Sequence, residues 1–144
     1  MNIHIFNNQK DLSLSKPAVR RLVQTVLQAE KASHTEVSIY FVTTRKITEL
    51  HDEFFDDPTP TDCISFPLGD EHLGEVFVCP ATATAYAKKK KLNPYDETAL
   101  YIVHGLLHCL GYDDLESKDR RIMRKKEKTC MALLKEQKVS LHGP

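Results

Sequence analysis

The sequence contains no apolar run that approaches the roughly 20 residues a membrane-spanning helix requires, so it predicts no membrane partner. It has no excess of charge of either sign, because 20 basic residues balance 20 acidic ones, and no general attraction to nucleic acid follows. Residues 1–6 lack the basic segment and apolar core of a signal peptide, which favours a cytoplasmic location. None of the four cysteines stands in a CxxC pair, so we expect reduced thiols.

The composition is that of an ordinary globular chain, with 41% hydrophobic and 28% charged residues, and a length of 144 residues predicts a single domain, residues 1–144. Strands are expected near residues 2–7, 36–42, 63–66 and 74–79. Helices are expected after residue 15 and near residues 44–54, 81–91, 98–110 and 117–135, with a frayed tail over residues 139–144. This mixture favours an α+β fold, a small mixed four-stranded sheet packed with about five helices, the helix of residues 98–110 being central.

The most informative segment is HGLLHCLGYDD, residues 104–114. His104 and His108 stand four residues apart, so on a helix both imidazoles project from one face and reach one ion. Gly111 tolerates the left-handed dihedral angles that end a helix and turn the chain back. Either Asp113 or Asp114 can then supply a third ligand. Three protein ligands leave the fourth position to water, which is the arrangement of a catalytic metal site with the metal-bound water as nucleophile.

Polar residues of this helix lie on one narrow stripe. Glu97, Tyr101, His104 and His108 follow the spacing i, i+4, i+7, i+11, and nearly every other position is apolar. A helix that is apolar all round is buried, and a buried polar group left unsatisfied costs roughly 1–3 kcal/mol. The pattern therefore favours metal binding by the two histidines over a paired histidine in the core. Cys109 points about 100° away from His108 around the helix, which predicts packing rather than ligation.

Three segments in the same order resemble the YbeY endoribonuclease family. Residues 104–114 match HGxLHxxGYDH, PTDCISFP at residues 60–67 matches PTDVLSFP, and LGE at residues 73–75 matches LGD. The resemblance implies an α+β, metal-dependent RNA hydrolase, usually described with zinc, that acts in maturation of small-subunit ribosomal RNA and in ribosome quality control. It also implies ribosomal RNA and the small ribosomal subunit as partners, with no DNA expected.

Carried over position by position, the resemblance makes His104 and His108 the first two metal ligands. Asp114 stands where the family has its third histidine. A carboxylate still binds zinc at about 2.0–2.2 Å, but its negative charge weakens the pull of the ion on its bound water, so manganese, iron or nickel are alternatives to zinc. The loop and strand that the family places beside the metal supply the catalytic candidates, which are Thr61, Asp62 and Ser65.

Phe55 is a second departure, because the family has an arginine there that would clamp a phosphate. The clamp would come instead from Arg45, Lys46 or the basic run of residues 88–91, whereas His51 replaces the usual asparagine. A further basic run spans residues 120–128, and each run alone is typical of a solvated helix face. Single-stranded RNA is the expected substrate form, because its splayed bases stack on aromatic rings, the candidates being Phe54, Phe55, Phe66 and Tyr112.

Two other functions fit parts of the pattern. HxxxHxxGxxD has the ligand spacing of the metzincin proteases, but Gly105 stands where those enzymes carry the glutamate general base, which argues against proteolysis. The other alternative is a ribosome-associated binding module whose metal site is degenerate and mainly structural. Asp114 and Phe55, the two departures from the family pattern, are the reason to consider it.

Overall fold

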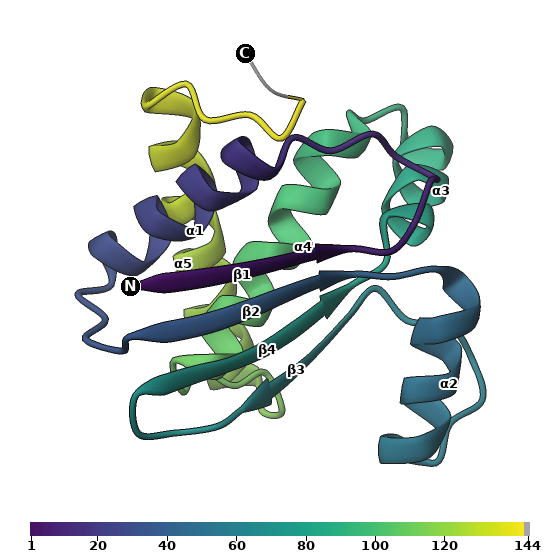
Figure 1. Cartoon of the computed structure of the whole chain (residues 1–144), viewed down its shortest axis with the longest axis horizontal. Helices are drawn as coiled ribbons and strands as arrows, with labels where there is room; N and C mark the ends of the chain where they lie inside the picture. Colours follow the sequence, from purple (N-terminus) through teal and green to yellow (C-terminus); the bar gives the residue numbers. More distant parts are fainter. Residues whose placement is uncertain (143–144) are drawn as a thin grey trace.

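The computed structural model describes residues 1–142, and these form a four-stranded mixed sheet and five helices (Figure 1). The strands are β1 (Asn2–Asn7), β2 (Glu36–Phe41), β3 (Cys63–Pro67) and β4 (His72–Val78). The helices are α1 (Lys16–Ala29), α2 (Thr44–Phe55), α3 (Pro80–Lys90), α4 (Pro94–Cys109) and α5 (Ser117–Glu136). In the order β1-β2-β4-β3, β2 is parallel to both of its neighbours, and β3 and β4 form an antiparallel hairpin. The predicted α+β class is confirmed.

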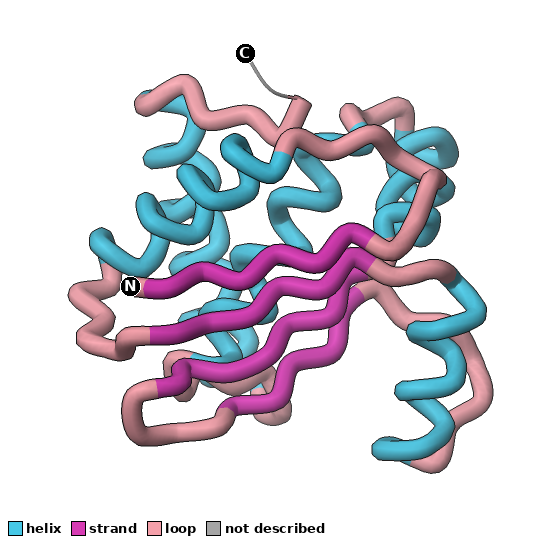
Figure 2. Tube along the Cα trace, viewed as in Figure 1, coloured by secondary structure: helices cyan, strands magenta, loops and turns pink. Residues whose placement is uncertain are grey.

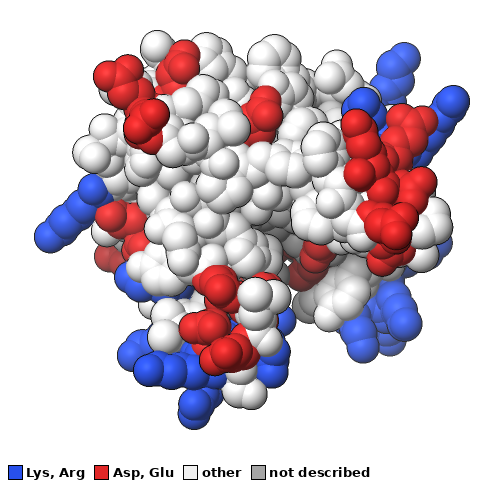
Figure 3. Space-filling model, turned by 90° about the horizontal axis from the view of Figure 1, so that it is seen from below, with Lys and Arg blue, Asp and Glu red and all other residues white. Residues whose placement is uncertain are grey.

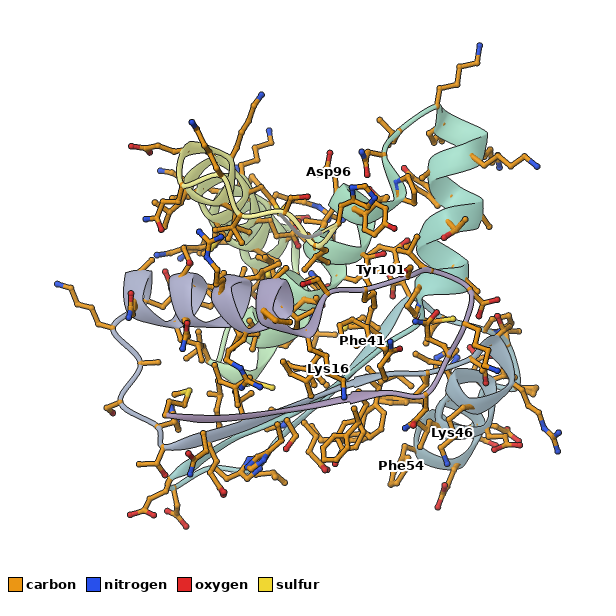
Figure 4. The ribbon with its side chains drawn as sticks, turned by 45° about the horizontal axis from the view of Figure 1, so that its top comes forward. Lys16, Phe41, Lys46, Phe54, Asp96 and Tyr101 are labelled. Atoms are coloured by element: carbon orange, nitrogen blue, oxygen red, sulfur yellow. The ribbon has the colours of Figure 1, made fainter. Side chains whose placement is uncertain are left out.

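Helix α4 lies at the centre of the molecule. It contacts β3 and β4 on one side and α1, α3 and α5 on the others, so no broad face of it reaches solvent (Figure 2). Ile102, Leu106 and Leu107 are fully buried, which explains why this helix is apolar almost all round. Phe41 of β2 and Tyr101 of α4 point into the same core between the sheet and the helices (Figure 4).

The ends of α4 are fixed by local sequence. The Asn93 side chain accepts hydrogen bonds from the backbone N–H groups of Tyr95 and Asp96 at 2.8 and 3.4 Å, and Pro94 occupies the first turn. At the other end Gly111 adopts a φ of +102°, where a side chain would be strained. The chain therefore turns back immediately after the second histidine.

The opposite face of the sheet carries a row of aromatic rings. Phe6 stacks on Tyr40 and Tyr40 on Phe77, with ring centroids 4.7 and 4.5 Å apart. Phe66 meets Phe77 edge to face, and Phe54 extends from α2 to Phe66 at 4.9 Å (Figure 4). These contacts hold α2 against one end of the sheet.

The described part of the tail is ordered by packing. Leu141 is only 1% exposed, and its carbonyl accepts a hydrogen bond from the Ser15 N–H, so the predicted fraying is wrong up to residue 142. Residues 143 and 144 lie outside the described part of the chain. Among residues 1–142, no helix combines the length and the apolarity needed to cross a bilayer.

Candidate metal centre

Three side chains converge at the end of α4. The Nε2 atoms of His104 and His108 are 3.0 Å apart, and Asp114 Oδ2 lies 3.6 Å from each of them. The helical spacing of four residues brings the two imidazoles together, and the turn at Gly111 returns the chain so that the carboxylate joins them. One nitrogen or oxygen from each residue lies within 4.8 Å of the others, so the group has the geometry of a metal site.

The chemistry of this donor set fits a divalent ion. Ligand bonds of about 2.0–2.1 Å in a tetrahedral zinc site place the ligand atoms roughly 3.3–3.4 Å apart. The separations of 3.0 and 3.6 Å lie on either side of this spacing. Two imidazoles and one carboxylate suit zinc, manganese or iron, and three protein ligands leave a coordination position free for water or substrate.

The two aspartates of the loop have different roles. Asp113 Oδ1 accepts a hydrogen bond from the Leu115 N–H at 2.8 Å, so this side chain shapes the turn that leads into α5. Asp114 is the one whose carboxylate reaches both histidines. The turn thus points the Asp114 carboxylate toward the two histidines and directs the Asp113 carboxylate to the backbone of the turn itself.

Glu127 of α5 orients the first histidine. Its Oε2 accepts a 2.6 Å hydrogen bond from Nδ1 of His104, and its Oε1 accepts one of 3.1 Å from Arg124. Burial raises the pKa of Glu127, but the hydrogen bonds and positive charges of His104 and Arg124 together lower it by more, so the group is a carboxylate. Because Nδ1 must then carry the proton, Nε2 presents its lone pair to the metal position. Burial lowers the pKa of His104, but the hydrogen bond to Glu127 and the negative charges of Glu127, Asp114 and Asp62 together raise it, for a net rise.

Glu127 was not singled out from the sequence. A signal for it existed, because Met123, Glu127, Cys130 and Leu134 form the buried stripe of α5 at i, i+4, i+7 and i+11. An acid on the apolar stripe of an amphipathic helix needs a partner. The sequence did not indicate that the partner would be His104.

A second unpredicted contact anchors the loop that carries Asp114. The Tyr112 hydroxyl donates a 2.7 Å hydrogen bond to Glu30 Oε1, and Lys126 Nζ lies 3.0 Å from Glu30 Oε2. These three side chains come from the loop, from the end of α1 and from α5. The turn that carries Asp114 is thus fixed to two helices through the Tyr112 hydroxyl, and stacking of the Tyr112 ring on RNA stays a prediction.

The two histidines open into a hollow of about 300 Å³, lined by His51, Phe55, Thr61, Cys63, Ile64, Ser65, His104 and His108. Of the catalytic candidates, Thr61 and Ser65 line it. Asp62 does not line it. Its Oδ1 accepts hydrogen bonds from the Cys63 N–H at 2.7 Å and from the Thr61 hydroxyl at 3.3 Å. Its negative charge still contributes to the raised pKa of His104.

Phe55 and His51 occupy the rim of the hollow where the family pattern places its arginine and asparagine. His51 Nδ1 donates a 2.7 Å hydrogen bond to the Thr59 carbonyl, and its Nε2 lies 3.9 Å from Asp57 Oδ2. No lysine or arginine lines the hollow within the described residues. Arg45, one expected clamp, pairs instead with Glu49 on the surface of α2.

The other sequence candidates lie elsewhere or pack. Of the four expected stacking aromatics, only Phe55 lines the hollow. Cys109 is outside the ligand group, and burial raises its pKa to about 12. Gly105 faces the sheet, where a Cβ would lie 2.4 Å from Val76 Cγ1. The residue after the first histidine therefore packs against β4, which gives a structural reason against the protease alternative.

Known proteins share both this sequence and this fold. The family model for endoribonuclease YbeY matches residues 4–135. The chain belongs to the YbeY endoribonuclease family. It is 50% identical to the endoribonuclease YbeY of Protochlamydia amoebophila, over 92% of this chain and 93% of that protein. It is 38% identical to that of Chlamydia muridarum, over 97% and 92% of the two chains.

A solution structure from Thermotoga maritima superimposes with a TM-score of 0.68 at 25% identity and covers 94% of this chain and 91% of that one. Membership of the YbeY family confirms the resemblance drawn from residues 60–67, 73–75 and 104–114. It also favours an RNA-cleaving enzyme over the alternative of a binding module with a degenerate metal site.

Proposed function

We propose that this chain is a metal-dependent endoribonuclease in which His104, His108 and Asp114 hold one divalent ion, with zinc as the first choice. The observation that carries the proposal is the convergence of these three ligand atoms at the mouth of a hollow, with the first histidine oriented by Glu127. Family membership supports RNA as the substrate. We further propose ribosomal RNA of the small subunit in the cytoplasm as the setting, with residues 1–144 acting as one domain.

When bound, a divalent ion at this position supplies positive charge beside the scissile phosphate and a water of lowered pKa. The protein's own groups do the remaining work. Glu127 holds the proton of His104 on Nδ1, so that the opposite nitrogen stays a ligand. Thr61 and Ser65 line the hollow. The Thr61 hydroxyl donates to Asp62 Oδ1 at 3.3 Å, which leaves the Ser65 hydroxyl as the group that could donate to a phosphate oxygen.

Cleavage of a labelled single-stranded RNA tests the proposal. We expect His104→Ala and His108→Ala to abolish cleavage, while His4→Ala, a surface histidine of β1, leaves it unchanged. Chelator should remove the activity, and added Zn²⁺ or Mn²⁺ should restore it. Full activity in both α4 variants would rule the proposal out, and so would activity that persists after the metal has been stripped.

A further inference from the structure

Among the described residues, the hollow at the metal centre has no cationic side chain to hold the phosphates that flank the cleaved bond. No lysine or arginine lines it within the described residues, and its α2 side is acidic, with Asp52, Glu53, Asp56 and Asp57 at the end of that helix. Figure 3 shows acidic side chains gathered on the right of one face, over α2, and lysine and arginine side chains at the lower left, beside a second acidic group, and at the lower right. Phosphates that flank the cleaved bond are therefore repelled on one side and need a cationic surface on another.

Helix α5 presents such a surface. A shallow depression of about 710 Å³ lies over its first three turns and is lined by Ser117, Arg120, Arg121, Arg124, Lys125 and Lys128. We call these six residues the basic face of α5. All of them are exposed, and five of the six carry a positive charge. Arg124 pairs with Glu127, and Asp119 lies in the first turn of the same helix, so the net positive charge of this face comes mainly from Arg120, Arg121, Lys125 and Lys128.

The basic face follows from helix periodicity. Residues 117, 121, 124 and 128 have the spacing i, i+4, i+7, i+11 and form one stripe. The buried stripe at residues 123, 127, 130 and 134 has the same spacing, six residues further along. At about 100° per residue the two stripes are separated by about 120° around the helix. Packing of one stripe on α4 therefore directs the other to solvent, along the whole N-terminal half of α5.

In the described part of the chain, most of these cations have no carboxylate partner. Arg121, Lys125 and Lys128 have no carboxylate within 4.0 Å among residues 1–142. Lys126 differs, because it points to the other side of α5 and pairs with Glu30. Exposed charges left unpaired side by side repel one another, so a polyanion that binds across them gains both attraction and relief of that repulsion.

The basic face is connected to the metal centre through Arg124. Its guanidinium donates to Glu127 Oε1 at 3.1 Å, and the other oxygen of Glu127 accepts the hydrogen bond of His104. The helix also begins three residues after the third ligand, Asp114. A strand with one phosphate at the metal centre can thus reach the basic face within a few nucleotides.

We propose that the basic face of α5 binds the phosphate backbone of single-stranded RNA adjacent to the cleavage site and replaces the arginine that Phe55 displaces. This inference rests on the proposed nuclease function, and it assigns the surface that holds the substrate. Binding is electrostatic and independent of base sequence, with phosphates contacting Arg121, Lys125 and Lys128.

Fluorescence anisotropy with a labelled 20-nucleotide single-stranded RNA in chelator measures binding apart from cleavage. Replacing Arg121, Lys125 and Lys128 together with alanine retains helix propensity, so the variant should fold. Each phosphate neutralised by a cation contributes about 0.7 to the slope of log Kd against log salt for single strands, so the slope should become shallower by about 2. The Kd at low salt should rise at least about tenfold, because three cations no longer bind phosphates.

The matched control removes the same charge from the end of α3, with Lys88, Lys89 and Lys90 replaced by alanine. These exposed lysines lie beside the start of α4, about 21 Å along that helix from His108 at 1.5 Å per residue. For this control variant, the slope of log Kd against log salt should stay within about 0.5 of the parent value.

The proposal would be overturned if the salt slope of the α5 variant were unchanged, or if the α5 and α3 variants lost RNA affinity equally. If the α5 variant binds RNA as the parent does, RNA is excluded as the ligand of this face. Because chelator is present, these outcomes do not depend on whether the protein cleaves RNA.

Discussion

His104 donates a 2.6 Å hydrogen bond from Nδ1 to Glu127, and this contact joins the helix that carries two ligands to the helix that carries the basic face. Glu127 is 4% exposed and receives a second hydrogen bond from Arg124. One buried carboxylate thus sets the tautomer of a ligand and positions a surface arginine. The proposed metal centre therefore depends on the α4–α5 interface and not on the histidine motif alone.

Replacing Glu127 with glutamine should weaken metal binding without removing a ligand. The neutral amide still accepts a hydrogen bond from Nδ1 of His104, but without the negative charge Nε2 of His104 is a weaker base and a weaker ligand. Loss of such a hydrogen-bonded partner of a ligand typically costs about 10–100-fold in metal affinity. Isothermal titration with Zn²⁺ measures the change. Glu136→Gln, an exposed acid at the end of the same helix, is the control. Equal affinities for the two variants would show that Glu127 does not support the site.

Asp114→Asn and Asp113→Asn should separate the two aspartates. Asp114→Asn replaces the anionic ligand, so its loss of zinc affinity should exceed the roughly 100-fold that an outer partner accounts for. Asp113→Asn keeps an oxygen to accept from the Leu115 N–H, so metal affinity should stay near the parent value. Metal content after dialysis provides the measurement. A larger loss in the Asp113 variant would reassign the third ligand.

Phe55→Ala should weaken RNA binding, whereas Phe54→Ala should not. The two rings are equally exposed, at 56% and 55%, but only Phe55 lines the hollow, while Phe54 packs against Phe66. Loss of one stacked base costs about 1–3 kcal/mol, at least about fivefold in Kd. The Phe54 variant should instead lose about 1 kcal/mol of stability from its aromatic contact. Fluorescence anisotropy in chelator measures RNA binding, and thermal melting measures stability. Weaker RNA binding in the Phe54 variant but not in the Phe55 variant would contradict the prediction.

Gly105→Ala should destabilise the fold. In an open helix this change stabilises by about 0.5–1 kcal/mol, but here the new Cβ would lie 2.4 Å from Val76 Cγ1 and 3.0 Å from Cys63 Sγ. Overpacking of this kind costs about 1–3 kcal/mol. In a Val76→Ala background the cost of Gly105→Ala should be smaller, because the clashing methyls are gone. Denaturant unfolding of the parent, the two single variants and the double variant tests this prediction. A stabilising effect of Gly105→Ala in the parent would refute the close packing of α4 on β4.

The sequence predicts most of the fold because local signals specify it. The 3.6-residue period and the Asn93-Pro94 start define α4, and the β-branched segments define the four strands. The same helical period places His104 and His108 together, so two of the three proposed ligands follow from spacing alone.

What the sequence does not indicate are the pairings between distant segments. Glu127 lies 23 residues from His104, and Glu30 lies 82 residues from Tyr112. Both acids are ordinary members of amphipathic helices until the helices pack. The choice between Asp113 and Asp114 also depends on one turn, because consecutive side chains there point in different directions. Periodicity describes faces of elements, whereas these contacts depend on which faces meet.

The most direct test of the metal centre is anomalous scattering from crystals grown with Zn²⁺ and measured on both sides of the zinc absorption edge. The structure predicts one strong peak per chain, bonded to Nε2 of His104, Nε2 of His108 and Oδ2 of Asp114, with a non-protein ligand in the remaining position. No peak between these atoms, or a peak bonded to Asp113 or Cys63 instead, would contradict the proposed site.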